Sequence, residues 1–185
     1  MSSHTNPKTK TDLIIPSDAV QIEYSPFAID VENPQINLLK TCRELGVAVV
    51  AYSPLGRGMM TGAYTSPADF EEGDFRKYAP RFSKENFPKN LKLVEELQKI
   101  AKKKNCTAGQ LTLAWLLAQG EDIIPIPGTK KIKYLEENLG ALEVQLSEGE
   151  EKEIRALVEG AEVHGLRYPE VMVGHLFADT PELKA

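Results

Sequence analysis

No apolar run in the sequence approaches the roughly 20 residues that a helix needs to cross a bilayer. The first ten residues are polar and lack the apolar core of a secretory signal. These absences argue against a membrane protein and against secretion. We therefore expect a cytoplasmic protein with no membrane partner.

Cysteine is scarce, with only Cys42 and Cys106 among 185 residues, and no Cys-x-x-Cys occurs. That usage argues against a disulfide framework and against a zinc cage. His164, His175 and Asp179 lack the spacing of a metal-binding motif. We expect two reduced thiols and no metal.

Positive charge is not in excess, because 22 Lys and Arg face 27 Asp and Glu for a formal net charge of -5. Neutralising a nucleic-acid backbone needs a basic face, so we expect no nucleic-acid partner. Hydrophobic residues make up 42% and charged residues 26%, which is a globular composition. The length suits one ordinary domain.

Apolar patterning predicts strands that alternate with helices, which is typical of right-handed βαβ crossovers and a parallel sheet. The run at 47–52 is apolar throughout, as in a parallel strand that is covered on both faces. Three parallel strands leave two exposed edges, so the sheet looks like part of something larger. Strands are predicted at 19–24, 47–52 and 123–127, and helices at 33–46, 91–104, 107–120, 128–142 and 147–158.

Two other segments carry glycines and prolines instead of a periodic pattern. Residues 53–87 form a long irregular stretch, and loops of that length in a compact domain are usually functional lids or disordered linkers. Residues from Gly160 onward are predicted to form a tail that is laid over the surface.

Loops at the carboxyl ends of parallel strands build the ligand site in α/β folds. The second strand ends in Tyr52, which can stack on a flat ring, and Ser53 to Gly58 offer hydroxyl, backbone and guanidinium donors that suit a pyrophosphate. After the third strand, Thr129 at a helix N-terminus, with Lys130 and Lys131, predicts an anion site. Glu137 and Asn138 follow and suit a purine edge. Turn chemistry alone also explains the glycines and prolines, but the loops together indicate a dinucleotide.

Three ordered blocks carry a family resemblance: VQIEYSPF (20–27), VVAYSPLGRGMMTG (49–62) and IIPIPGTKKIKYLEENLGAL (123–142). They resemble the C-terminal half of an aldo-keto reductase, of the fungal and plant branch with aryl-alcohol dehydrogenase-like and pyridoxal reductase-like members. The resemblance implies an α/β fold that is part of a TIM (β/α)₈ barrel, corresponding to about its last three βα units. Residues 18–185 would form the C-terminal part of this oxidoreductase domain, and residues 1–17 a flexible tail outside the family pattern.

By the same resemblance, the chain would hold NADP(H). Gln21 matches the residue that binds the nicotinamide carboxamide, and Tyr52 the aromatic that stacks on the nicotinamide ring. The pyrophosphate loop corresponds to Ser53, Leu55, Gly56 and Arg57. The 2′-phosphate site corresponds to Gly128 and Thr129 with Lys130 or Lys131, and the adenine contacts to Glu137 and Asn138.

The family's Asp, Tyr, Lys and His tetrad, in which the Tyr donates a proton to a carbonyl oxygen, has no recognisable counterpart in this chain. The three histidines, His4, His164 and His175, lie in the terminal regions. We therefore expect a truncated reductase of small carbonyl compounds that is inactive alone, with no catalytic residue in the chain. Two alternatives stay open: a non-catalytic NADP-binding or protein-interaction module that self-associates through strand edges, or a complete enzyme with further sequence upstream.

Overall fold

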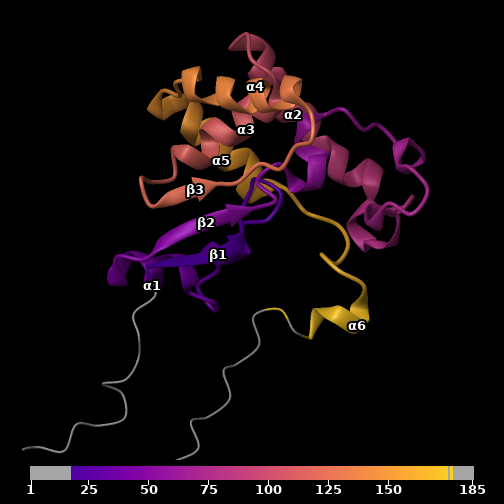
Figure 1. Ribbon diagram of the computed structural model, residues 1–185, viewed down its shortest axis with the longest axis horizontal. Coiled ribbons are helices and arrows are strands. Elements are labelled where there is room, and N and C mark those ends of the chain that lie inside the picture. Colours follow the sequence, from indigo (N-terminus) through magenta and orange to yellow (C-terminus); the bar gives the residue numbers. More distant parts are fainter. Residues whose placement is uncertain (1–17, 175, 177–185) are drawn as a thin grey trace, which may run out of the picture.

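The computed structural model describes residues 18–174 and residue 176, and its centre is a three-stranded parallel sheet. The strands are β1 (Ala19–Glu23), β2 (Ala48–Tyr52) and β3 (Ile123–Pro125), in the order β1-β2-β3. Val50 of β2 lies opposite Gln21 on one side and Ile124 on the other. The arrowheads in Figure 1 point the same way, toward the long loop after β2. The predicted parallel α/β fold is confirmed, while the predicted tail 1–17 lies outside the described residues.

The helices follow the predicted order, and two of them begin with capping boxes. Thr107 accepts from the backbone of Gln110 and Ser147 from that of Glu150, and each partner's side chain reaches back. No helix within the described residues is long and apolar enough to cross a membrane. The helices are α1 (Leu38–Leu45), α2 (Phe87–Lys103), α3 (Ala108–Leu117), α4 (Ile132–Leu139), α5 (Glu148–Gly160) and α6 (Glu170–Val173).

Helix α1 begins later than predicted, because Asn33 builds a turn. Its side chain accepts from the backbone of Gln35 at 2.9 Å, and its carbonyl accepts from that of Asn37 at 2.7 Å. Asn37 is left-handed, with a φ of 53°, so a continuous helix cannot pass through it. Asn33 and Pro34 therefore belong to a turn, and the predicted start at residue 33 is wrong.

Helix α4 also begins later than predicted, at Ile132. The hydroxyl of Thr129 accepts from the backbone of Lys131 at 3.1 Å, which closes a local turn before the helix. Threonine side chains commonly compete with helix geometry in this way. Thr129 thus precedes the helix instead of standing at its N-terminus, which corrects the sequence interpretation.

The core lies on one face of the sheet. Alternate residues of β2, Val49 and Ala51, are fully buried beneath helices, and Trp115 of α3 is fully buried with them. Helix α1 contacts β2, and α3 contacts β3. On the opposite face Ile124 is 48% exposed. The prediction that both faces are covered is therefore wrong for the described residues, since helices cover one face only.

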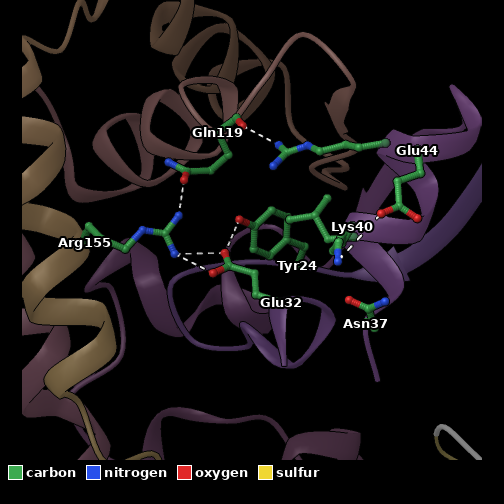
Figure 2. Close-up of a pocket in the computed structure, with 9 residues that line it drawn as sticks. Tyr24, Glu32, Asn37, Lys40, Glu44, Gln119 and Arg155 are labelled. Carbon is green, nitrogen blue, oxygen red and sulfur yellow. Dashed lines mark hydrogen bonds and ion pairs between the residues drawn. The ribbon is translucent and has the colours of Figure 1, made fainter. Parts of the chain in front are cut away.

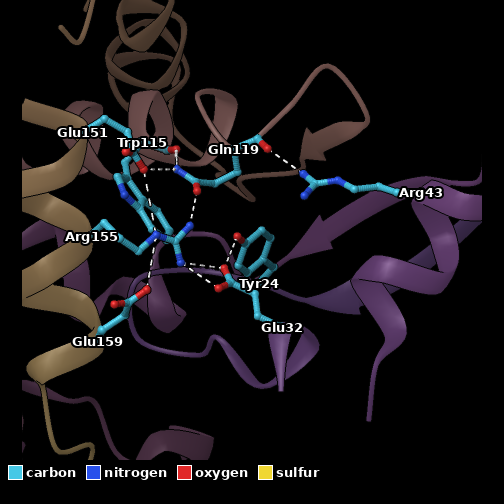
Figure 3. A network of polar contacts seen from close by, with 8 residues as sticks. All are labelled: Tyr24, Glu32, Arg43, Trp115, Gln119, Glu151, Arg155 and Glu159. Atoms are coloured by element: carbon cyan, nitrogen blue, oxygen red, sulfur yellow. Dashed lines mark hydrogen bonds and ion pairs between the residues drawn. The ribbon is translucent and has the colours of Figure 1, made fainter. Parts of the chain in front are cut away.

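A polar network fastens α5 to the region that follows β1 (Figure 3). The guanidinium of Arg155 lies 4.8 Å from the ring centre of Trp115 and pairs with Glu32 at 2.7 Å. Its other donor group binds Gln119, and Glu32 also accepts from the hydroxyl of Tyr24. Burial and then the hydrogen bond to Glu32 raise the pKa of Tyr24 well above its usual range. The network joins segments that are far apart in the sequence.

A cavity of about 500 Å³ opens beside this network (Figure 2). Its charged groups already have partners: Arg155 pairs with Glu32, Lys40 with Glu44, and Arg43 with Asp122. We therefore interpret this cavity as the solvent-facing side of the structural network and not as a ligand site.

The capping carboxylate of α5 predicts a pH-dependent contribution to stability. The Lys104 ammonium lies 2.7 Å from Glu150, and this contact and the Ser147 donors lower the Glu150 pKa from 4.5 to about 2. Because the folded-state pKa is depressed, the stabilisation is present above the usual carboxyl pKa and is lost as the pH falls toward 2. Glu150→Gln should lower the melting temperature near neutral pH, and the difference from the unchanged chain should shrink in acid.

Thermal unfolding followed by circular dichroism at several pH values measures this difference. Glu148→Gln is the control, because Glu148 is 95% exposed and forms only a loose pair with Lys152. A melting difference for Glu150→Gln that stays constant from neutral pH into acid would contradict the expected role of the charge.

Candidate functional site

A cleft of about 540 Å³ opens where β2 and β3 end. One wall is the loop after β2, and the other is the loop after β3 together with α4. A Cβ placed on Gly109 of α3 would lie 3.8 Å from both Leu55 and Glu137, so Gly109 stands between the two walls. The predicted site residues that line the cleft are Tyr52, Ser53, Leu55, Arg57, Gly128, Thr129, Glu137 and Asn138.

Four other predicted residues do not line the cleft. Gln21 is exposed on β1, on the sheet face that also carries Tyr52. Gly56 is buried under the loop, where a Cβ would lie 3.2 Å from the Phe27 ring. Lys130 and Lys131 are exposed on the turn before α4, with the Lys131 ammonium 5.8 Å from the ring centre of Tyr134. None of these four residues is in the cleft lining, so their predicted roles in cofactor binding stay predictions.

The loop after β2 has an unusual backbone. Ser53, Gly56, Arg57 and Gly58 all have positive φ, at 48°, 57°, 58° and 91°. At Gly58 a Cβ would approach Tyr64 Cε2 to 3.0 Å and the Arg76 side chain to 3.2 Å, so glycine is required there for space as well as for conformation. The loop therefore has one well-defined path along the cleft wall.

Arg76 holds that path in place from the far side of the loop. It donates to the backbone carbonyl of Arg57 at 3.0 Å and pairs with Asp74 at 2.6 Å. Its guanidinium lies 4.3 Å from the ring centres of Tyr64 and Phe70. The hydrogen bond from Arg76 lowers the pKa of the Asp74 carboxyl, so the pair remains ionised at neutral pH.

Tyr52 sits in an environment that keeps it neutral. Burial raises the Tyr52 pKa to about 12, and a side-chain hydrogen bond with Tyr168 and the charge of Glu23 add to the shift. A neutral phenol at the end of a central strand places its ring in the cleft wall, while its hydroxyl is held by Tyr168. It is suited to stacking and hydrogen bonding, and it is poorly suited to releasing a proton at neutral pH.

Sequence reasoning missed several residues that line the cleft. Thr61, Ala63 and Tyr64 reach it because the loop folds back on itself, and Tyr134 reaches it from the first turn of α4. Gly109 lies in helix α3, and its position between the two walls depends on contacts with distant segments that the sequence does not show. The signal available in the sequence was that Thr61 and Tyr64 flank Gly62, close to the loop that was already predicted to bind the ligand.

The arrangement offers hydrogen-bond donors and a flat ring. Among the residues that the structure describes, no cluster of three His, Cys, Asp or Glu side chains is placed to hold a metal ion. The cleft combines an aromatic face from Tyr52, a cation from Arg57, hydroxyls from Ser53 and Thr129, and an amide from Asn138. Such a set can hold an elongated ligand that has flat rings and anionic groups.

Comparisons with known proteins agree on one family. The model of the aldo/keto reductase family matches residues 4–159. An aldo-keto reductase of Schizosaccharomyces pombe, yakc, whose name specifies NADP(+), is 58% identical over 170 residues. That match covers 92% of this chain and 50% of the relative. Aldo-keto reductase str7 of Strobilurus tenacellus is 57% identical, over 91% of this chain and 49% of its own length.

A solved structure shows the same fold. Glycerol dehydrogenase AKR11B4 from Gluconobacter oxydans superposes with a TM-score of 0.69 at 23% identity, over 90% of this chain and 46% of that one. The chain spans about half the length of the curated relatives that it matches.

Proposed function

The chain belongs to the aldo/keto reductase family, and from this premise we propose that its cleft binds the phosphorylated nicotinamide dinucleotide NADP(H). The observation that carries the proposal is the meeting of two separate loops around one cleft. Loops 52–58 and 127–129, which lie some 70 residues apart, together with α4 bring Tyr52, Arg57, Thr129 and Asn138 to the lining of one cleft. The name of the Schizosaccharomyces pombe relative, which specifies NADP(+), supports the same cofactor.

The donor set fits such a ligand in chemical terms. The neutral Tyr52 ring suits stacking on a nicotinamide, and Arg57 offers a guanidinium for a pyrophosphate. Lys130 and Lys131 are exposed beside Thr129, where a 2′-phosphate would find positive charge. Glu137 and Asn138 offer an acceptor and an amide for the adenine edge. Gln21 shares a sheet face with Tyr52 and is proposed to reach the carboxamide.

The proposed activity of the whole protein is NADPH-dependent reduction of small aldehydes or ketones, for which the cofactor supplies the hydride. In this proposal the 185 residues contribute the cofactor cradle, and the proton-donating tetrad comes from sequence outside them. The division rests on the sequence-based expectation that the tetrad has no counterpart in these residues, and the raised Tyr52 pKa, which disfavours that residue as an acid, is consistent with it. The free thiols Cys42 and Cys106 are compatible with a reducing compartment, and we propose a cytoplasmic location.

A second candidate function, an NADP-binding or interaction module, is favoured by the open side of the sheet. Strands β1 and β3 each have one neighbour in the described sheet, and Ile124 and Ile126 are 48% and 42% exposed. Unpaired strand edges pair readily with other chains. Self-association through these edges is the form of this alternative that the exposed residues support.

Cofactor preference tests the proposed site. We expect the 185-residue chain to bind NADPH more tightly than NADH by about tenfold or more, since a charge-assisted phosphate contact is worth that much. Replacing both Lys130 and Lys131 by Met should remove most of the preference, while Lys152→Met on α5 should leave it unchanged. Fluorescence titration gives both dissociation constants. Equal affinities for the two nucleotides would reject the assignment of the 2′-phosphate site.

Carbonyl-dependent oxidation of NADPH tests whether the 185 residues contain a proton donor of their own. The purified chain should bind NADPH without oxidising it when an aldehyde is added, because a cradle without a proton donor does not complete the reaction. Absorbance of the reduced cofactor measures the rate, and a complete aldo-keto reductase serves as the positive control. Turnover by the 185 residues that persists through repeated purification would show that the chain contains its own acid.

A further inference from the structure

Arg57 lies in an aromatic cage at the mouth of the cleft. Its guanidinium carbon is 5.3 Å from the ring centre of Phe75 and 4.6 Å from that of Tyr168. The two rings are tilted by 57°, with centres 6.2 Å apart. One Nη1 donor of Arg57 points to the backbone carbonyl of Arg167 at 3.4 Å. The cage thus joins the loop after β2 to a segment 110 residues further along the chain.

The charge of Arg57 has no carboxylate partner within the described part of the chain. By contrast, Arg43, Arg76, Arg155 and Arg167 all form ion pairs there. A guanidinium is weakly hydrated and stacks well on rings, while the donors at its edge stay available for an anion. The two rings therefore hold the Arg57 guanidinium by its flat faces, and its charge beside the cleft has no carboxylate partner among the described residues.

Tyr168 reaches the cage on a strap, which we define as residues 163–168. Asn90 of α2 is buried and clasps the strap at His164, accepting from its backbone N–H at 2.8 Å and donating to its carbonyl at 2.9 Å. Arg81 donates to the carbonyl of Gly165 at 3.3 Å. Gly165 has a φ of +87°, and a Cβ there would approach the Pro80 backbone to 2.7 Å.

Arg167, two residues after Gly165, fixes the strap with ion pairs. Arg167 is buried and pairs with Glu23 at 3.1 Å and with Asp30. These contacts bring the strap across the end of β1 and leave Tyr168 little freedom. The position of the Tyr168 ring is thus set by α2, by the loop 80–82 and by the end of β1, none of which lines the cleft.

We propose that Tyr168 and Phe75 are positioning residues for Arg57, which they hold ready for the pyrophosphate of the dinucleotide. The inference rests on the proposed function. An arginine that is already ordered loses little rotamer freedom when it binds a phosphate, so the cage raises affinity without touching the ligand. Cofactor affinity therefore depends on a strap that lies outside the nucleotide-binding loops.

A double-mutant cycle on the 185-residue chain tests this proposal, with the NADPH dissociation constant as the readout. Tyr168→Leu should weaken binding by about tenfold, because one face of the cage is lost and Arg57 regains rotamer freedom. Tyr168→Phe keeps the ring beside Arg57 and removes only the hydroxyl that bonds Tyr52, so it measures that second contact separately and should lose less affinity than Tyr168→Leu. In an Arg57→Ala background, Tyr168→Leu should weaken binding no more than Tyr168→Phe does, because the part of the loss that acts through the guanidinium has already occurred.

Control variants keep the test falsifiable. Val171→Ala, at a strongly exposed position of α6, should leave NADPH affinity unchanged. Phe75→Leu removes the opposite face of the cage and replaces Tyr168→Leu if that variant loses its circular dichroism spectrum. Two results would reject the role of the cage and leave the proposed function standing. One is an unchanged NADPH affinity in Tyr168→Leu, and the other is an equal loss of affinity from this change in the presence and absence of Arg57. Absence of NADPH binding to the unchanged chain would reject both.

Discussion

The parallel pairing of β2 with both neighbours is the constraint on which the cleft depends. Because the three strands run the same way, their carboxyl ends meet at one edge of the sheet. The loops after β2 and β3 therefore face each other, although about 70 residues separate them in the sequence. Reversing one strand would send Tyr52 and Thr129 to opposite ends of the molecule, and no single cleft would form.

Two sets of arginine contacts turn that topology into a fixed site. Arg76 holds the carbonyl of Arg57 from behind, and Phe75 and Tyr168 hold its guanidinium from the sides. A third arginine, Arg155, secures α5, from whose end the strap departs. In each case aromatic rings and polar partners together fix the orientation of the guanidinium group. An arginine can therefore be ordered even where it has no carboxylate partner.

Local patterns in the sequence predicted the elements and about half of the cleft lining, and contacts between distant segments account for much of what they missed. Tyr52 and Asn138 were found because strand ends and helix faces follow from apolar periodicity. The start of α1 and the place of Thr129 were not found, because side-chain turns at Asn33 and Thr129 compete with the helix. The strap looked like a surface tail, since its clasp by Asn90 joins residues 74 positions apart.

A crystal structure of the 185-residue chain grown with NADP⁺ would test the central claim most directly. The account predicts one dinucleotide along the cleft, with its nicotinamide ring against Tyr52, its pyrophosphate at Arg57 and its adenosine end beside Thr129 and Asn138. A dinucleotide bound at a different place in the molecule, with these residues untouched, would contradict the account.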